Sequence, residues 1–178
     1  MHYKKLVGER IYLSPIDVEN EVAILTKWVN EDHDIAVNNG FYNSTIDLNK
    51  MQEKLDNWNS SPSCLAIVRS LDDAFMGQVS LFDYRGNNTC ATLGIFIGPE
   101  YRNQGYGQEA MNLICDFAFK NLRLEAIHLE VFSFNEKAIK SYENNGFVRC
   151  GRYRRSYYFD GQYHDIILME KLNHFNRK

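Results

Sequence analysis

The sequence predicts an α+β fold: a mixed, mostly antiparallel sheet with two helices before its central strands and two after them. Three apolar runs between residues 64 and 97 are joined by short polar turns, which is typical of an antiparallel meander. On both sides of this meander, apolar residues recur every three or four positions, as in amphipathic helices. With 178 residues and no linker or repeat, the chain is expected to form one domain, 1–178.

The N-terminal part supplies a short strand and two helices. Residues 10–13 are expected to form the strand, and residues 17–30 and 47–58 have helical spacing. Residues 38–43 are expected to form a loop, and the polar, proline-containing segment 60–62 should stop the second helix. The apolar positions are Val22, Leu25, Trp28 and Val29 in the first helix, and Met51, Leu55 and Trp58 in the second.

The central part of the chain predicts three strands, over residues 64–69, 75–84 and 89–97. Short turns at 71–73 and 85–88 connect them. Because such short connections can join only antiparallel neighbours, these strands should follow one another in the sheet.

The C-terminal part predicts a helix over residues 108–122, a strand over 125–132 and a short helix over 135–145. Gly146 suits the left-handed position that ends a helix, with Phe147 packing back onto it.

The chain should end in a β-hairpin. Asp160-Gly161 is a strong signal for a two-residue turn, and it separates strands expected over 153–159 and 162–172.

Residues 102–107, RNQGYG, are the most informative stretch of the sequence. They follow an apolar run and precede a helical segment, so they predict a tight turn at the start of a helix. Glycines allow such a turn and a close approach of ligand to backbone. The first amide groups of a helix lack intrahelical partners and lie at the positive end of its dipole. The turn is therefore a candidate site for a phosphate or diphosphate.

Other nucleotide-binding motifs fit this turn less well. A Walker A loop requires Lys where Gln108 and Glu109 stand. The dinucleotide fingerprint tolerates Ala110 in its third place, but the turn lies mid-chain after antiparallel strands and not in a first βαβ unit. Nucleotide binding remains an alternative, and a plain helix start is another.

Composition excludes several classes of protein. The net charge of −3, with both signs interspersed, argues against a dedicated nucleic-acid binder. Four cysteines without a C-x-x-C pair argue against a zinc knuckle, and no metal is expected. Residues 1–20 lack the long apolar stretch of a signal peptide, and no run approaches about 18 apolar residues, so no membrane association is expected. We expect a cytoplasmic protein with reduced cysteines, although their even number leaves disulfides open.

Taken together, three motifs resemble the GCN5-related N-acetyltransferase (GNAT) superfamily over about residues 8–172. Arg102, Gly105 and Gly107 match its Gln/Arg-x-x-Gly-x-Gly/Ala motif. The segment 135–147 is similar to its Asn-x-x-Ala-x-x-x-Tyr-x-x-x-Gly-Phe motif. The hairpin at 160–165 resembles that of the ribosomal-protein-alanine and spermidine acetyltransferase branch.

This resemblance implies a GNAT-like sheet with helices on both faces, splayed after the strand at 93–97 to admit acetyl-CoA. It implies acetyl-CoA as cosubstrate and a primary amine, in a small molecule, polyamine or protein N-terminus, as acceptor. The diphosphate would lie on the amides of residues 103–108, Arg102 would add a charged contact, and the pantetheine arm would bond to exposed strand backbone. The implied donor-binding residues are Ile95, Phe96, Ile97, Arg102, Asn103, Gln104, Gly105, Tyr106, Gly107, Gln108, Asn135 and Lys137.

The resemblance also implies catalytic roles. Tyr142 matches the general acid that protonates the leaving thiolate, although a tyrosine of pKa about 10 is a weaker acid than a thiol of about 8.5. As an alternative, Tyr142 belongs to an apolar helical stripe with Ala138 and Ile139. Asn135 could equally serve as a helix N-cap.

Glu130 is the candidate general base, either directly or through water. A solvated strand carboxylate is the alternative. Thr92 and Gly94 stand where related enzymes often carry a carboxylate, which weakens the case for a fixed base.

The acceptor side carries one further signal. His33 lies among Glu31, Asp32 and Asp34, in the region that frames the acceptor in the family, and an acidic rim would attract a cationic amine. A solvated loop is the interpretation that charge runs favour. The chain could form a homo-oligomer. The alternative to an enzyme is a catalytically silent CoA-binding or regulatory module of the same fold.

Overall fold

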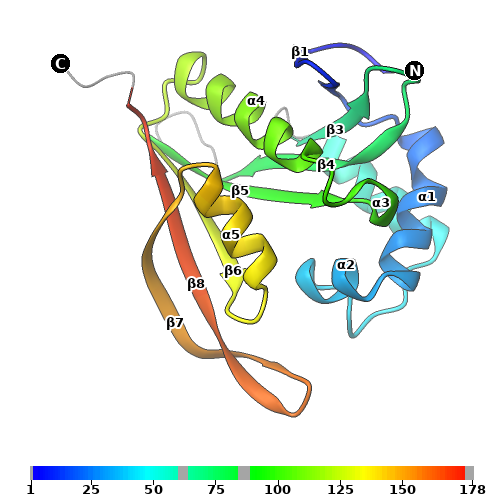
Figure 1. Cartoon of the computed structure of the whole chain (residues 1–178). Coiled ribbons are helices and arrows are strands. Elements are labelled where there is room, and N and C mark those ends of the chain that lie inside the picture. The colour runs from blue at the N-terminus through cyan, green and yellow to red at the C-terminus, as the bar shows by residue number, and fades with distance from the viewer. Residues whose placement is uncertain (1, 60–63, 84–88, 175–178) are drawn as a thin grey trace. The chain divides into compact units, whose positions relative to one another are not determined.

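The computed structural model describes residues 2–59, 64–83 and 89–174 (Figure 1). The chain divides into two compact units, of which the first comprises Met1–Ser80 with Ile95–Ile114 and the second Leu81–Gly94 with Cys115–Lys178. In chain order the elements are β1 (Leu6–Val7), β2 (Ile11–Ser14), α1 (Val18–Glu31), α2 (His33–Asn38), α3 (Leu48–Asn59), β3 (Cys64–Arg69), β4 (Phe75–Phe82), β5 (Cys90–Ile97), the 3₁₀ turn η1 (Pro99–Tyr101), α4 (Tyr106–Lys120), β6 (Ala126–Phe132), α5 (Glu136–Asn144), β7 (Val148–Phe159) and β8 (Gln162–Leu172).

The described strands form a mixed, mostly antiparallel sheet with the strand order β1-β2-β3-β4-β5-β6-β8-β7. The predicted α+β class is therefore confirmed. Within the described ranges, no helix is both long enough and apolar enough to cross a membrane.

The strands of the first unit pair in antiparallel order. β2 pairs with β1 on one side and with β3 on the other, and β3 pairs with β4. The strands predicted at 10–13, 64–69 and 75–84 are thus confirmed as far as they are described. β1 was not predicted, because two residues are too few to show an alternating pattern. The breaks predicted at 60–62 and 85–88 lie outside the described residues.

The early helices α1 and α3 lie where the periodicity predicts them, and they pack on each other in the first unit. α2 is a correction, because residues 31–34 were interpreted as a solvated loop. The Asp32 side chain accepts a hydrogen bond from the Ile35 amide at 2.8 Å and caps α2. Burial of Ile35 and Val37 holds this short helix, and two apolar residues are too few to reveal helical spacing in the sequence.

The core of the first unit lies on both faces of its strands. Tyr12 belongs to a buried cluster with α1 and α3, in which Trp28 stacks on Phe75 with ring centroids 5.5 Å apart. Ile11 and Leu13 point to the opposite face and are equally buried, and α4 crosses that side (Figure 1). This arrangement agrees with the expected helices on both faces.

In the second unit, β5 and β6 pair in parallel over three positions only, from Cys90↔Ala126 to Thr92↔His128. β6 pairs along its length with β8, which forms a long hairpin with β7 (Figure 1). β7 begins at Val148 and not at the predicted residue 153. Register shifts at Arg149/Gly151 and Tyr153/Tyr157 interrupt its alternation, which hides the strand in the sequence.

The turn chemistry of the second unit follows its sequence. Gly146 has φ +83° at the end of α5, and Phe147 is buried, as predicted. Asp160 and Gly161 have φ values of 49° and 77°, as the predicted hairpin turn requires. In the first unit, α4 begins two residues before the predicted start, at Tyr106.

A buried carboxyl group in α1 is unusual. Glu21 is 1% exposed, its Oε1 lies 2.6 Å from His2 Nε2, and its Oε2 has no hydrogen-bond partner among the described residues. Burial raises the pKa of Glu21 to about 8 and also lowers the pKa of His2. At neutral pH both groups are therefore uncharged, and the carboxyl O–H donates to the imidazole.

We predict that Glu21→Gln removes part of the pH dependence of stability, because the amide keeps a donor for His2 but cannot ionise. The folded-state pKa of about 8 lies above the ordinary value of 4.5, so this contribution is complete below pH 4.5 and is lost as the pH rises through about 8. Between about pH 6 and about pH 9, the wild type should lose on the order of 2 kcal/mol more of its unfolding free energy than the variant.

Urea unfolding across this pH range is the measurement. Glu53→Gln, at an exposed position of α3, is the matched control and should follow the wild type. Equal pH dependence in Glu21→Gln and wild type would contradict the assignment of a neutral pair.

Candidate donor-binding turn and catalytic residues

The glycine-containing turn lies in the first unit, between η1 and α4. Asn103 and Gly105 adopt left-handed conformations, with φ 59° and 84°. The Glu109 amide donates to the Gly105 carbonyl at 3.1 Å, which closes the first turn of α4. The amides of the intervening residues therefore lie at the positive end of the helix, as an anion site requires.

The two glycines of the turn differ in what they permit. A side chain at Gly105 would be strained at this φ, and its Cβ would lie 3.0 Å from Arg10 Nη2. A Cβ at Gly107 would lie 3.4 Å from the Ile97 side chain, which leaves room for a small residue. The backbone conformation therefore needs glycine at Gly105, whereas Gly107 matters only if a ligand approaches it closely.

Arg102 begins the turn and is held by three groups. Its guanidinium donates to both carboxylate oxygens of Asp32, at 2.6 and 3.1 Å, and to the Ile97 carbonyl at 3.1 Å. A longer contact of 3.4 Å reaches Asp34. Arg102 is thus engaged with protein groups, and its predicted contact to a diphosphate stays a prediction.

Asp32 accepts hydrogen bonds both from Arg102 of the turn and from the Ile35 amide at the start of α2. Partial burial opposes its ionisation, but the Arg102 guanidinium and the Ile35 amide outweigh this cost, so the pKa of Asp32 is lowered. Arg102 and Asp32 are 27% and 17% exposed, and the pair is therefore better shielded from water than a surface ion pair. Asp32 is therefore partly buried and paired, whereas Glu31, His33 and Asp34 are exposed.

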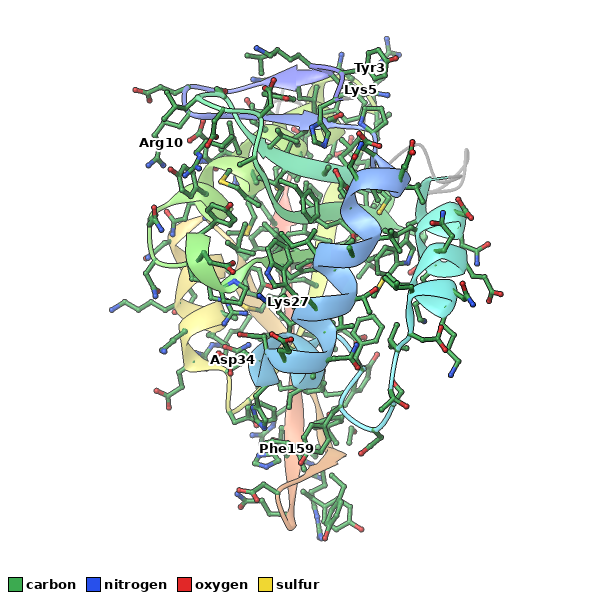
Figure 2. All side chains as sticks on the ribbon, turned by 90° about the vertical axis from the view of Figure 1, so that its right-hand side faces the viewer. Tyr3, Lys5, Arg10, Lys27, Asp34 and Phe159 are labelled. Atoms are coloured by element: carbon green, nitrogen blue, oxygen red, sulfur yellow. The ribbon has the colours of Figure 1, made fainter. Side chains whose placement is uncertain are left out.

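A second carboxylate holds the other end of the turn. Glu109 Oε1 accepts hydrogen bonds from the amides of Glu9 and Arg10 at 2.7 and 2.8 Å, and Oε2 accepts one from Arg10 Nε at 3.2 Å. Arg10 Nη1 donates to the Gln104 carbonyl at 2.9 Å, and the guanidinium lies 4.8 Å from the centre of the Tyr106 ring. Arg10 lies at the surface, half exposed (Figure 2).

The predicted strand part of the donor site is Ile95–Ile97, at the end of β5 in the first unit. These three residues are partly buried, and the next amide, of Gly98, donates to the Met76 carbonyl at 2.8 Å. The paired register of β5 with β6 ends before this stretch, at Thr92.

The candidate acid, Tyr142, lies on α5 in the second unit. The residue is partly exposed as a whole and its ring meets Phe147 edge-on, with centroids 6.0 Å apart. Its hydroxyl is in a crowded environment, and burial raises the pKa of Tyr142 to about 12. Tyr142 therefore keeps its proton at any physiological pH.

Three other predicted residues lie in the second unit. Asn135 is the N-cap of α5, and its side chain accepts from the Ala138 amide at 3.1 Å. Lys137, in the first turn of α5, is exposed. Glu130 is exposed on β6, opposite Leu168 of β8. The N-cap alternative for Asn135 is thus confirmed, and it does not exclude a ligand contact through another atom.

Sequence reasoning missed an aromatic cluster in the second unit. Phe132 stacks on Tyr157 with centroids 4.0 Å apart, and Phe134 stacks on Phe159 at 5.4 Å and meets His164 edge-on at 4.8 Å. Glu130 and Phe132 share one face of β6 by alternation. Arg10, Asp32 and Glu109 were also not predicted as parts of the turn.

Metal binding has no support in the described ranges, where no three His, Cys, Asp or Glu side chains are grouped to hold an ion. The candidate groups are the helix-start amides of the turn, a protonated tyrosine and a carboxylate.

Comparison with known families decides the class. A model of the acetyltransferase (GNAT) domain matches residues 10–148 of the chain. The chain belongs to the GNAT acetyltransferase family. The predicted class of enzyme, an acetyl-CoA-dependent N-acetyltransferase, and the predicted cosubstrate are confirmed.

The curated relatives of this GNAT chain include spermidine acetyltransferases. It is 27% identical over 152 residues to the spermidine N(1)-acetyltransferase of Escherichia coli (strain K12), a match that covers 85% of this chain and 75% of that protein. It is 30% identical over 103 residues to the spermidine N(1)-acetyltransferase of Vibrio cholerae, covering 58% of this chain and 60% of that one.

Solved structures show the same fold. The Vibrio cholerae spermidine N-acetyltransferase in complex with CoA and spermine superposes with a TM-score of 0.79 at 21% identity, covering 93% of this chain and 97% of that one. A GNAT acetyltransferase from Bacillus anthracis reaches a TM-score of 0.82 at 15% identity, with coverages of 94% and 98%. A dodecameric form of the Vibrio cholerae enzyme reaches 0.76 at 21% identity, with coverages of 96% and 99%.

We predict that Glu109→Gln destabilises the GNAT chain, because a neutral amide cannot accept the amides of Glu9 and Arg10 as strongly as a carboxylate does. The expected loss is about 1–2 kcal/mol of unfolding free energy. Urea unfolding measures it, and backbone hydrogen exchange at residues 9–11 should become faster. Glu53→Gln again serves as control, and a Glu109→Gln variant as stable as this control would contradict the role of Glu109.

Proposed function

We propose that this GNAT enzyme transfers the acetyl group of acetyl-CoA directly to a primary amine, with a polyamine as the foremost acceptor. The observation that carries the proposal is the turn at 102–107, which presents helix-start amides and is held by the side chains of Asp32 and Glu109, outside the turn. The similarity to spermidine acetyltransferases supports the choice of acceptor.

In this proposal the amides of residues 103–108 bind the diphosphate of the donor. A left-handed Gly105 and the start of α4 supply converging N–H groups and a favourable dipole. The strand backbone of Ile95–Ile97 binds the pantetheine arm, whose amides match strand donors and acceptors. Asn135 and Lys137 provide the remaining contacts to the donor.

The reaction needs a neutral amine, which attacks the thioester carbonyl, and an amide donor near Ile95–Ile97 for the oxyanion. The tetrahedral intermediate then collapses, the C–S bond breaks, and the thiolate of CoA takes a proton. We assign that proton to Tyr142. The attacking amine loses its proton to Glu130, directly or through water, and exchange with solvent then returns Tyr142 and Glu130 to their starting protonation states.

The acidity of Tyr142 defines how it can act. Its pKa of about 12 lies well above the value of about 8.5 for a thiol. Complete transfer to a free thiolate would therefore be uphill, by roughly 5 kcal/mol. Tyr142 is suited to donate a hydrogen bond while charge develops on sulfur, and to complete the transfer only as a proton reaches it from solvent or from the amine.

We assign the acceptor to the class of small cationic amines. The acidic residues at 31–34 are not the basis of this assignment. Asp32 is neutralised by Arg102, so the rim attracts a cation less than its composition suggests. Glu130, Glu31 and Asp34 are exposed carboxylates that could attract a cationic amine. By analogy with the dodecameric relative, we also propose that the chain assembles as a homo-oligomer.

We predict that purified protein releases CoA thiol from acetyl-CoA with spermidine or spermine faster than with an aminoglycoside or an N-terminal alanyl peptide. A thiol-release assay over this panel, with mass spectrometry of the acetylated amine, is the measurement. Calorimetry with CoA runs in parallel. Thiol release at background for every amine, together with CoA binding, would favour a silent CoA-binding module instead.

We predict that Tyr142→Phe lowers kcat by about a hundredfold or more, because the proton donor is removed while the ring is kept. The KM for acetyl-CoA should change by less than about twofold, since the lost interaction acts mainly in the transition state. Tyr158→Phe removes a hydroxyl from a tyrosine that is 63% exposed, and it should behave as wild type. A Tyr142→Phe enzyme with full turnover would refute the assignment of the acid.

A further inference from the structure

The ion pair between Arg102 and Asp32 connects two segments that lie 70 positions apart in the sequence. Arg102 is the first residue of the turn, and its Nε also donates to the Ile97 carbonyl at the end of β5. Asp32 ends α1 and caps α2 through the Ile35 amide. One carboxylate therefore fixes the start of the turn and the start of a helix together.

We propose that Asp32 is a positioning residue for donor binding, acting through Arg102, and this proposal rests on the proposed donor site. The bidentate contact fixes the plane of the guanidinium, and Arg102 then fixes the Ile97 carbonyl and the first residue of the turn. Amides that bind a diphosphate must be held within a fraction of an ångström, because small displacements cost binding and rate.

The geometry favours this role over a direct phosphate contact by Arg102. The pair uses Nε and both Nη atoms of the guanidinium on protein acceptors. Turning Arg102 toward a phosphate would leave the Asp32 carboxylate without its cation. Because this carboxylate is only 17% exposed, losing its cation would be costly. Arg102 therefore supports the turn from the protein side, while the amides face the ligand.

The test variant is Asp32→Asn. Asparagine caps helices as well as aspartate does, so the Ile35 amide keeps its acceptor and α2 its start. The charge and the second oxygen for Arg102 are lost. Asp116→Asn, in the exposed pair with Lys120 at 2.7 Å on α4, removes a comparable ion pair outside the turn and is the control.

The measurement is calorimetric binding of CoA, which does not depend on acetyl transfer. We expect the Kd of CoA to rise roughly tenfold in Asp32→Asn, which corresponds to about 1.4 kcal/mol, and to stay unchanged in the control. In steady-state assays the KM for acetyl-CoA should rise more than kcat falls. Adding Asp32→Asn to Arg102→Gln should cost no further affinity, because Asp32 acts through Arg102.

Several outcomes would overturn the proposal. An unchanged Kd in Asp32→Asn would mean that the pair serves folding only, and a lower Kd would mean that Asp32 competes with the diphosphate for Arg102. A wild-type chain that does not bind CoA would overturn the proposed function and this inference with it. If the wild type binds CoA and Asp32→Asn binds it with the same Kd, this inference alone would be overturned.

Discussion

The helix-start amides of the turn at 102–107 have no partners inside α4, so the turn must be stabilised by other contacts. Two carboxylates from outside the turn's own backbone provide them. Asp32 holds Arg102 at the start, and Glu109 joins α4 to the amides of Glu9 and Arg10. The turn is thus fixed from the side of its carbonyls and side chains, and its helix-start amides stay available to an anion.

The two carboxylates solve different parts of the problem. Glu109 sits in a short run of backbone amides, a concave arrangement that binds anions well. Asp32 instead meets a guanidinium whose planar geometry transmits orientation to the Ile97 carbonyl. Because hydrogen bonds to charged groups exceed neutral ones in strength, two such contacts can outweigh the loss of ordinary turn hydrogen bonds.

Local pattern predicted the fold well and the supports of the site poorly, for one physical reason. Helical spacing, the Asp160-Gly161 turn and the left-handed Gly146 are determined by neighbours in the sequence, and each was found where expected. Arg10 and Glu109 meet across 99 positions, and a contact of this range leaves no periodic signal. α2 was missed for the related reason that its stability comes from burial of Ile35 and from a cap shared with Arg102.

The same distinction between local pattern and environment applies to Tyr142, the proposed acid. The sequence pattern assigned Tyr142 a role but gave it the ordinary acidity of a phenol, whereas its environment on α5 raises the pKa to about 12. Burial penalises the phenolate and therefore keeps the proton on Tyr142, which suits a donor that must be protonated before every turnover. The same burial makes full proton release unfavourable. In the mechanism that we propose, catalysis by such a residue depends on where the sulfur of the donor is held.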